Sequence, residues 1–243
     1  MFHRILIVTA VAAEADSVTA GLGPGAPGLL PLPGGLALRR HGHVDVLVGG
    51  VGPAAVAAAT GTALACETLA GGGYGLVVSA GIAGGFPPAA PVGSVVVSSA
   101  IVAADLGAET PDGYLAVEEL GFGRSVHPAP EALTGRIAAA LDAGGPPHAL
   151  APVLTVSTVT GTARRAAELA ERHPDAAAEA MEGFGVAEAA AAHGVPAVEI
   201  RAVSNAVGPR DRAAWRIGEA LGALRDTFEL LSRTVFVESW EPS

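Results

Sequence analysis

The segment 180–205 constrains the fold of this chain more than any other part of its sequence. Small residues at helical spacing run from about 181 to 193, a turn follows at 194–196, and an apolar run then ends in Asn205. This order predicts a helix, a short turn and a buried strand with a polar residue at its carboxyl end. Ligands of open α/β sheets bind at the carboxyl ends of strands. We therefore expect Asn205 to face a ligand, with Glu182 close by at the start of the helix.

Apolar β-branched runs alternate with helical segments along the rest of the chain, and this alternation predicts an α/β fold. We expect strands near 4–10, 36–40, 44–50, 74–79, 92–103 and 152–159, and helices near 14–19, 54–69, 131–142, 163–172 and 212–233. The Gly- and Pro-rich segment 21–35 is predicted to be a loop. With 243 residues, of which 50% are hydrophobic, the chain can form one large core. We expect a single domain at 1–233 and a tail at 234–243, in which 235–237 is a candidate edge strand.

Charge and cysteine content exclude several classes of protein. The net charge of −10 argues against binding to a nucleic acid or to an anionic membrane. Cys66 is the one cysteine, so neither an intramolecular disulfide nor a cysteine zinc site can form. The two histidines at 41–43 have no third ligand nearby in the sequence, and we expect neither a metal nor another cofactor. The strand-like start is too short for a signal peptide, and apolar runs break before the ~18 residues of a membrane span, so we expect a cytoplasmic location.

Four short motifs fall at predicted strand ends or helix starts. Glu14 follows the first strand, a glycine-rich turn at 81–85 follows the fourth, Met181-Glu182 opens a late helix, and Asn205 ends the strand after it. Each motif has an ordinary structural explanation. A carboxylate complements the dipole of a helix start, glycine permits a positive φ in a turn, and asparagine favours turns. Their convergence on one edge of the sheet nevertheless predicts a single site.

In their order and spacing, the four motifs resemble those of the nucleoside phosphorylase/nucleosidase superfamily. That family has a catalytic glutamate after its first strand, a Gly-Xaa-Ala-Gly-Gly turn, a Met-Glu pair at a late helix, and a strand that ends in Ser-Asp or Ser-Asn. The resemblance extends from Arg4 to about Arg233. It implies a three-layer α/β/α fold with a central mixed sheet that curls partly into a barrel. It also implies a homo-oligomer, most often a dimer.

The resemblance implies a role for each motif around a small nucleoside substrate. Glu182 would hold the ribosyl 2′ and 3′ hydroxyls, and Met181 would pack on the sugar. Glu14 would activate the attacking water, and Asn205 would face the purine edge. Carboxylates suit this chemistry because cleavage of an N-ribosidic bond passes through an oxocarbenium-like sugar, and a positioned base contributes roughly a hundredfold to ten-thousandfold. The other residues expected around the substrate are Gly81, Ile82, Ala83, Val159, Thr160, Gly161 and Phe184.

Two departures from the methylthioadenosine/adenosylhomocysteine nucleosidases change the expected substrate. Asn205 stands where they have Asp, and Ile82 where they often have Ser. The Asn amide can donate to O6 of a 6-oxopurine while its carbonyl accepts from a protonated N7. An adenine base would leave a buried polar group unpaired, at a cost of about 1–3 kcal/mol.

The segments 9–13 and 75–79 contain no basic residue that could bind phosphate. Together with Asn205, this resembles the futalosine hydrolases, which release hypoxanthine from futalosine in menaquinone biosynthesis. Futalosine carries a bulky aromatic carboxylate at its 5′ end. The resemblance therefore implies an open or apolar 5′ pocket and one cation, which the sequence does not identify.

Three other functions remain open at this point. An adenine-releasing nucleosidase of the methylthioadenosine type conflicts with Asn205. A 6-oxopurine nucleoside phosphorylase needs phosphate ligands, for which Arg39 and Arg40 are the candidates. A non-catalytic nucleoside-binding protein would need neither Glu14 nor Glu182.

Overall fold

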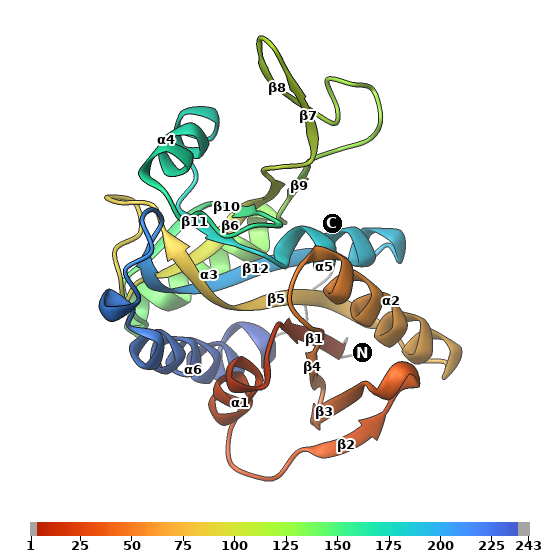
Figure 1. The fold of residues 1–243 in the computed structure, drawn as a ribbon. Coiled ribbons are helices and arrows are strands. Elements are labelled where there is room, and N and C mark those ends of the chain that lie inside the picture. The colour runs from red at the N-terminus through yellow and green to blue at the C-terminus, as the bar shows by residue number, and fades with distance from the viewer. Residues whose placement is uncertain (1–3, 238–243) are drawn as a thin grey trace.

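A mixed sheet of ten strands forms the centre of the computed structural model, which describes residues 4–237 (Figure 1). The strands are β1 (Arg4–Thr9), β2 (Gly28–Pro31), β3 (Ala37–His41), β4 (Val44–Val48), β5 (Tyr74–Gly85), β6 (Val95–Ala103), β9 (Val126–Pro128), β10 (His148–Thr155), β11 (Ala178–Ala180) and β12 (Ala197–Ala206). Their order is β11-β10-β6-β12-β5-β1-β4-β3-β2, and β9 pairs with β6. A separate hairpin of β7 (Gly107–Thr110) and β8 (Gly113–Ala116) projects from the body of the molecule.

The middle of this sheet closes into a barrel. Strands β11, β10, β6, β12 and β5 follow one another, and β11 pairs back onto β5 with Ala178 opposite Gly85 and Glu179 opposite Gly84. β5 is parallel to β1 and β12, whereas β12 is antiparallel to β6, so the barrel is mixed. The predicted mixed sheet that curls partly into a barrel is confirmed.

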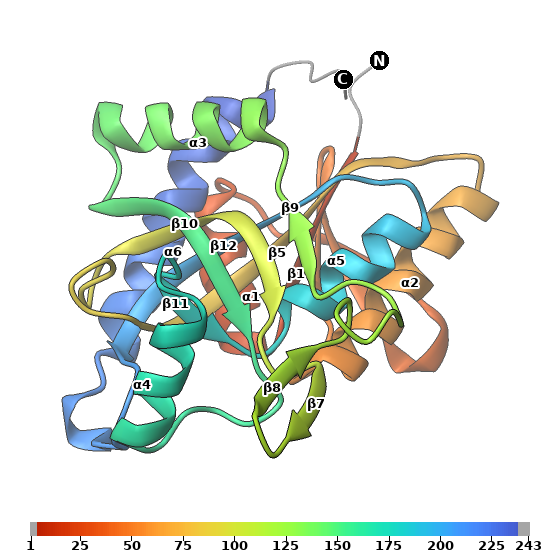
Figure 2. The same cartoon turned by 90° about the horizontal axis from the view of Figure 1, so that it is seen from above.

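Helices cover both faces of the sheet and produce the predicted three layers. α1 packs on α6 on one face and α2 on α5 on the other, while α3 packs against β6 and α6 (Figures 1 and 2). None of the helices within 4–237 has the length and apolar character that crossing a bilayer requires. The helices are α1 (Ala12–Gly21), α2 (Pro53–Leu69), α3 (Glu131–Gly144), α4 (Ala163–Arg172), α5 (Gly183–Ala192) and α6 (Ile217–Arg233).

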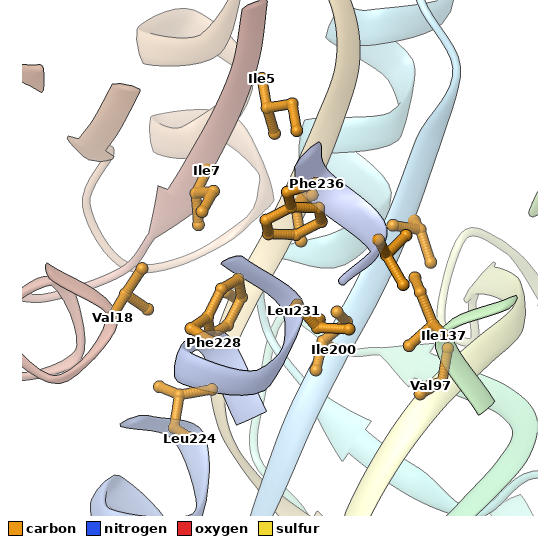
Figure 3. Packing of buried hydrophobic residues seen from close by; sticks show 14 of the residues in the cluster. Ile5, Ile7, Val18, Val97, Ile137, Ile200, Leu224, Phe228, Leu231 and Phe236 are labelled. Atoms are coloured by element: carbon orange, nitrogen blue, oxygen red, sulfur yellow. The ribbon is translucent and has the colours of Figure 1, made fainter. Parts of the chain in front are cut away.

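Strand β1 shows why the sheet is buried on both sides. Ile5 and Ile7 point into the core cluster formed with α1, α3 and α6, whose centre is Phe228 (Figure 3). Leu6 and Val8 point the other way, into the cluster formed with α2 and α5. Alternate residues of a strand face opposite sides of a sheet, so a continuous apolar run is what a strand between two helical layers needs.

Glycines let the helices approach each other closely. A Cβ on Gly185 of α5 would lie 2.1 Å from the carbonyl oxygen of Pro53 at the start of α2. On the other face, a Cβ on Gly21 of α1 would lie 2.4 Å from the carbonyl oxygen of Arg225 on α6. A larger residue at either position would separate the two helices. The contact at Gly185 holds the start of α2 against the start of α5, where the predicted ribose ligand Glu182 lies.

The predicted glycine turn at 81–85 is wrong. β5 continues through Gly85 as one strand of 12 residues, and none of its glycines has a positive φ. Space is the constraint instead: a Cβ on Gly81 would lie 2.4 Å from Glu14 Oε1, and one on Gly85 would lie 2.2 Å from the carbonyl oxygen of Ala90. Glycine permits both a positive φ in a turn and close approach within a strand, and the sequence pattern does not distinguish these two uses.

Other segments also differ from their predicted structure. The predicted strand 152–159 ends at Thr155, and the helix predicted over 212–233 begins at Ile217. β2 lies within the predicted loop 21–35 and pairs with β3 at the edge of the sheet. Residues 235–237 form a 3-10 turn rather than an edge strand, and Val235 and Phe236 are buried in the core. Within the predicted tail, residues 238–243 lie outside the described part of the chain.

We expect Phe228→Ala to lower the free energy of unfolding by about 3–5 kcal/mol, because it removes a large side chain from a close-packed core. Phe228 has 0% exposure, and its ring centroid lies 6.1 Å from that of Phe236. Leu69→Ala is the control, since Leu69 is 87% exposed, and we expect a change within about 0.5 kcal/mol. Urea unfolding measures both variants, and equal losses would contradict the assigned core.

Candidate active site

A buried arginine lies at the centre of the candidate site. Arg201 on β12 is 1% exposed, and its guanidinium donates to Glu199 Oε1 (2.7 Å), Ser79 Oγ (3.1 Å) and the Ile82 carbonyl (3.4 Å). The same group lies 3.1 Å from Glu182 Oε2. Burial lowers the pKa of the Arg201 guanidinium, but the surrounding carboxylates outweigh burial and raise this pKa above its usual range. The arginine therefore stays charged and holds carboxylates around it.

Glu182 lies immediately before α5 and is held from three sides. Its Oε1 accepts from the backbone N–H of Gly52 (3.2 Å), and its Oε2 accepts from the N–H of Met181 (3.3 Å) beside Arg201. Gly52 has φ = 91°, a conformation that favours glycine. A carboxylate oxygen has two lone pairs, so Oε1 keeps one that can accept from a ligand hydroxyl.

Glu14 lies in the first turn of α1 and joins the residues that follow β1 to the later part of β5. Its Oε2 accepts from the N–H groups of Ala10 (3.0 Å) and Val11 (3.2 Å), and its Oε1 accepts from Ile82 (2.9 Å). One lone pair remains on Oε1, which can take a proton from a bound water. These bonds fix the position of the Glu14 carboxylate between β1 and β5.

A β-bulge positions Asn205. The pairing of β12 with β5 shifts register between Val203 and Asn205, and such a bulge re-aims the side chain that follows it. Asn205 Nδ2 donates to the Ala206 carbonyl (3.0 Å), and its Oδ1 lies 2.8 Å from Ser204 Oγ. A carbonyl oxygen can only accept, so the amide nitrogen is the atom that faces Ala206.

The segment after β10 is fastened to the barrel by a buried carboxylate. Glu179 on β11 is 4% exposed, and it accepts from both the N–H (2.8 Å) and the hydroxyl of Thr160. Burial raises the pKa of Glu179, although the bonds from Thr160 oppose this. The contact places Val159 and Thr160 against the other residues of the site.

These residues enclose a cavity of about 240 Å³ at the carboxyl ends of the strands. The exposed side chains of Val11 and Val51 also line it. Trp215, which follows the 3-10 turn before α6, lines it as well. Eight of the predicted site residues lie around this cavity: Glu14, Ile82, Ala83, Val159, Thr160, Met181, Glu182 and Asn205.

Three predicted residues lie outside the lining of this cavity. Gly81 lies next to Glu14 and Arg201, where a Cβ would come within 2.4 Å and 2.6 Å of their side chains. Gly161 lies beside the stem of Arg210. Phe184 packs in a buried cluster, with its ring centroid 5.2 Å from that of His127.

The two arginines that were candidate phosphate ligands are paired with carboxylates. Arg39 Nη1 lies 2.5 Å from Asp16 Oδ1, and Arg40 binds Asp45 and Glu67. Neither arginine lines the cavity. Within 4–237, no three His, Cys, Asp or Glu side chains gather in a way that could hold a metal ion.

The chain matches the family model of the phosphorylase superfamily over residues 34–235. It is 58% identical over 240 residues to the futalosine hydrolase of Streptomyces coelicolor, and this covers 98% of each chain. The chain belongs to the futalosine hydrolase family. The family's protein from Acidothermus cellulolyticus is 48% identical over 236 residues, which covers 95% of this chain and 91% of the relative.

A solved structure shares the fold of this futalosine hydrolase family member. A mutant of the Helicobacter pylori nucleosidase MTAN, with 5′-methylthioadenosine in its active site, superimposes with a TM-score of 0.80. The match covers 97% of this chain and 99% of that chain at 18% identity. The predicted architecture is thus confirmed.

Sequence patterns did not reveal three charged residues of the site. Glu199 and Arg201 fall within the apolar run of a predicted buried strand, and Glu179 lies just before the Met-Glu pair. A charged residue on a strand that is buried from both sides needs a partner. Residues two apart on a strand share one face, so the spacing of Glu199 and Arg201 was a sign in the sequence that they form a pair.

We expect Glu199→Gln to change how stability depends on pH. Glu199 has 0% exposure, and its Oε2 has no hydrogen-bond partner within the described residues. Burial raises the pKa of Glu199 from 4.5 to about 7, although Arg201 opposes this. The folded protein therefore binds a proton at Glu199 more tightly than the unfolded protein does. The stability that this protonation contributes is present below pH 4.5 and is lost as pH rises through about 7. The wild type should therefore lose stability relative to Glu199→Gln over this range.

Urea unfolding between pH 4 and pH 8 measures the effect. The control is Glu219→Gln, which removes a carboxylate that is exposed on α6. Its stability should follow the wild-type curve. Parallel curves for Glu199→Gln and the wild type would show that the pKa of Glu199 does not change on folding.

Proposed function

We propose that this protein hydrolyses the N-ribosidic bond of futalosine, releasing hypoxanthine and leaving dehypoxanthine futalosine, as a step of menaquinone biosynthesis. The observation that carries this proposal is the convergence of Glu14, Glu182 and Asn205 on one cavity. It occurs in a chain that is 58% identical to the futalosine hydrolase of Streptomyces coelicolor. The three side chains supply a base for water, a ligand for the sugar and a contact for the purine.

Glu182 binds the ribosyl hydroxyls with the free lone pair of its Oε1. As the bond from the sugar to the base breaks, positive charge develops on the ribosyl ring. A carboxylate fixed in a buried site stabilises that charge more than water does, because it needs no reorientation during the reaction. The bonds from Gly52, Met181 and Arg201 provide this fixation.

Water is the proposed nucleophile, and Glu14 is the proposed base. The water oxygen bonds to the sugar carbon that the purine leaves, and Glu14 Oε1 takes the proton. Phosphate is a poorer candidate because Arg201, the cation that contacts Glu182, is already engaged by Glu199 and Glu182. Arg39 and Arg40 are paired with carboxylates as well.

Asn205 is proposed to select a 6-oxopurine. Its Nδ2 can donate to O6, and its Oδ1 can accept from N7 once N7 carries a proton. The electron pair of the broken bond stays on the purine, which takes its N7 proton from solvent water. Asparagine has no acidic proton to transfer, so Asn205 acts by stabilising the N7-protonated leaving group. Val159 and Thr160 line the cavity and are proposed to flank the base, and the bonds from Thr160 to Glu179 support this.

The test is chromatographic detection of the free base in phosphate-free buffer, with futalosine, inosine, methylthioadenosine and adenosylhomocysteine as substrates. Hypoxanthine from futalosine supports the proposal. Adenine from methylthioadenosine would make the protein a salvage nucleosidase, and a requirement for added phosphate would make it a phosphorylase.

We expect Glu14→Gln to retain substrate binding and to lower kcat by roughly 10²- to 10⁴-fold, because the amide cannot take a proton from water. Glu182→Gln should lower kcat by orders of magnitude as well, through loss of charge beside the sugar. Glu131→Gln is the control, an exposed carboxylate at the start of α3. Steady-state kinetics and isothermal titration separate turnover from binding, and wild-type turnover in Glu14→Gln would require another base.

We expect Asn205→Asp to shift the preference towards adenine nucleosides by roughly tenfold, since a protonated Asp can donate to N7 while its carbonyl accepts from a 6-amino group. The measured quantity is the ratio of kcat/KM for methylthioadenosine to that for futalosine. Asn205→Ala is the control, because it removes both polar atoms and should lower both values without reversing the preference. An unchanged ratio in Asn205→Asp would refute the proposed contact with the base.

Two expectations from the sequence accompany this proposal. The resemblance implies a homo-oligomer, most often a dimer, and the single cysteine, Cys66, suits a cytoplasmic location. Both stay predictions, which size-exclusion chromatography with light scattering and cell fractionation would test.

A further inference from the structure

Two arginines lie over an indole ring that lines the cavity. Trp215 follows the 3-10 turn Arg212–Ala214 and lines the cavity together with Asn205. The guanidinium carbons of Arg210 and Arg212 lie 5.4 and 5.8 Å from the centroid of the Trp215 ring. Both distances fall within the ~6 Å of a cation–π contact. One aromatic side chain thus gathers two positive charges beside the site.

These two arginines have their hydrogen-bond donors free. Over residues 4–237, neither Arg210 nor Arg212 forms an ion pair, whereas the neighbouring Arg216 lies 3.9 Å from Glu219. Asp211 stands between them, but its Oδ1 accepts from the backbone N–H of Ala213 (3.1 Å). The chain has a net charge of −10, so two neighbouring arginines without a carboxylate partner among these residues form a positive site on a negatively charged protein. Guanidinium forks match the geometry of a carboxylate.

The segment that carries the arginines is attached to the site at two points. The backbone N–H of Arg216 donates to the carbonyl of Ser204 (2.8 Å), next to Asn205. The stem of Arg210 packs against Gly161, where a Cβ would lie 3.5 Å from its Cγ and Cδ. These contacts fix the arginines relative to the cavity.

The size of the cavity indicates which part of a substrate they can reach. Its volume of about 240 Å³ is below the ~300–1,000 Å³ of sites that enclose drug-sized ligands. A nucleoside with an additional aromatic group must therefore extend out of it. At the cavity, Val11, Val51 and Val159 are 42%, 56% and 42% exposed. Apolar side chains, an indole and two free guanidinium groups together match an aromatic acid.

We propose that Arg210 and Arg212 bind the carboxylate on the aromatic group at the 5′ end of the substrate, and that Trp215 packs against its ring. The inference rests on the proposed function, because it assigns the recognition of one end of the same substrate. It also supplies the cation that the sequence did not identify.

The test compares futalosine with its methyl ester, which removes the negative charge and keeps the aromatic ring. In the wild type, kcat/KM for the acid should exceed that for the ester by roughly tenfold, through KM, as for an ion pair that is partly exposed. Added salt should reduce this preference. In the double variant Arg210→Ala/Arg212→Ala, the acid should be hydrolysed with the KM of the ester, and the salt effect should disappear.

The control is the double variant Arg225→Ala/Arg233→Ala, which removes the same charge from exposed positions on α6. These arginines pair with Asp226 and Glu229, and the control should keep the preference for the acid. An unchanged acid-to-ester ratio in Arg210→Ala/Arg212→Ala would overturn the inference and leave the proposed function intact. If the wild type released no hypoxanthine from futalosine, the proposed function would fall, and the inference would fall with it.

Discussion

The buried guanidinium of Arg201 is the interaction on which the rest of the site depends. It lies 2.7 Å from Glu199 and 3.1 Å from Glu182, and it also binds Ser79 and Ile82 of β5. A charge removed from water is tolerated only when carboxylates and hydrogen bonds surround it. The need to satisfy Arg201 therefore joins β12, β5 and the start of α5. It fixes Glu182 at the cavity as a consequence.

Close approach of the backbone makes this arrangement possible. A Cβ on Gly183 would lie 2.0 Å from Glu199 Oε2, and a Cβ on Gly81 would lie 2.6 Å from Arg201 Nη1. Glycine at these two positions leaves room for the charged side chains between α5 and β5. The glycine content of the chain thus serves the buried ionic network as well as the helix contacts.

The location of the site could be predicted from the sequence, whereas several of its contacts could not. Glu14, Glu182 and Asn205 could be placed at strand ends or helix starts, because periodicity and turn residues mark where elements begin and end. Phe184 is among the residues expected around the substrate, yet it packs against His127, since the direction of a helical side chain depends on its neighbours. The sequence offers Glu199, two residues away, as one partner of Arg201, but it gives no sign of the distant partners Ser79 and Glu182.

The sequence by itself determined the α/β class, the alternation of strands and helices, and the motifs that resemble the nucleoside phosphorylase/nucleosidase superfamily. All of these depend on local spacing, which a chain carries without its tertiary contacts. Only the tertiary structure decided that β11 closes the barrel onto β5, that the glycines at 81–85 belong to a strand, and that Arg210 and Arg212 meet Trp215. Each of these contacts brings together residues that are set in position by the packing of the whole chain, which local spacing in the sequence does not encode.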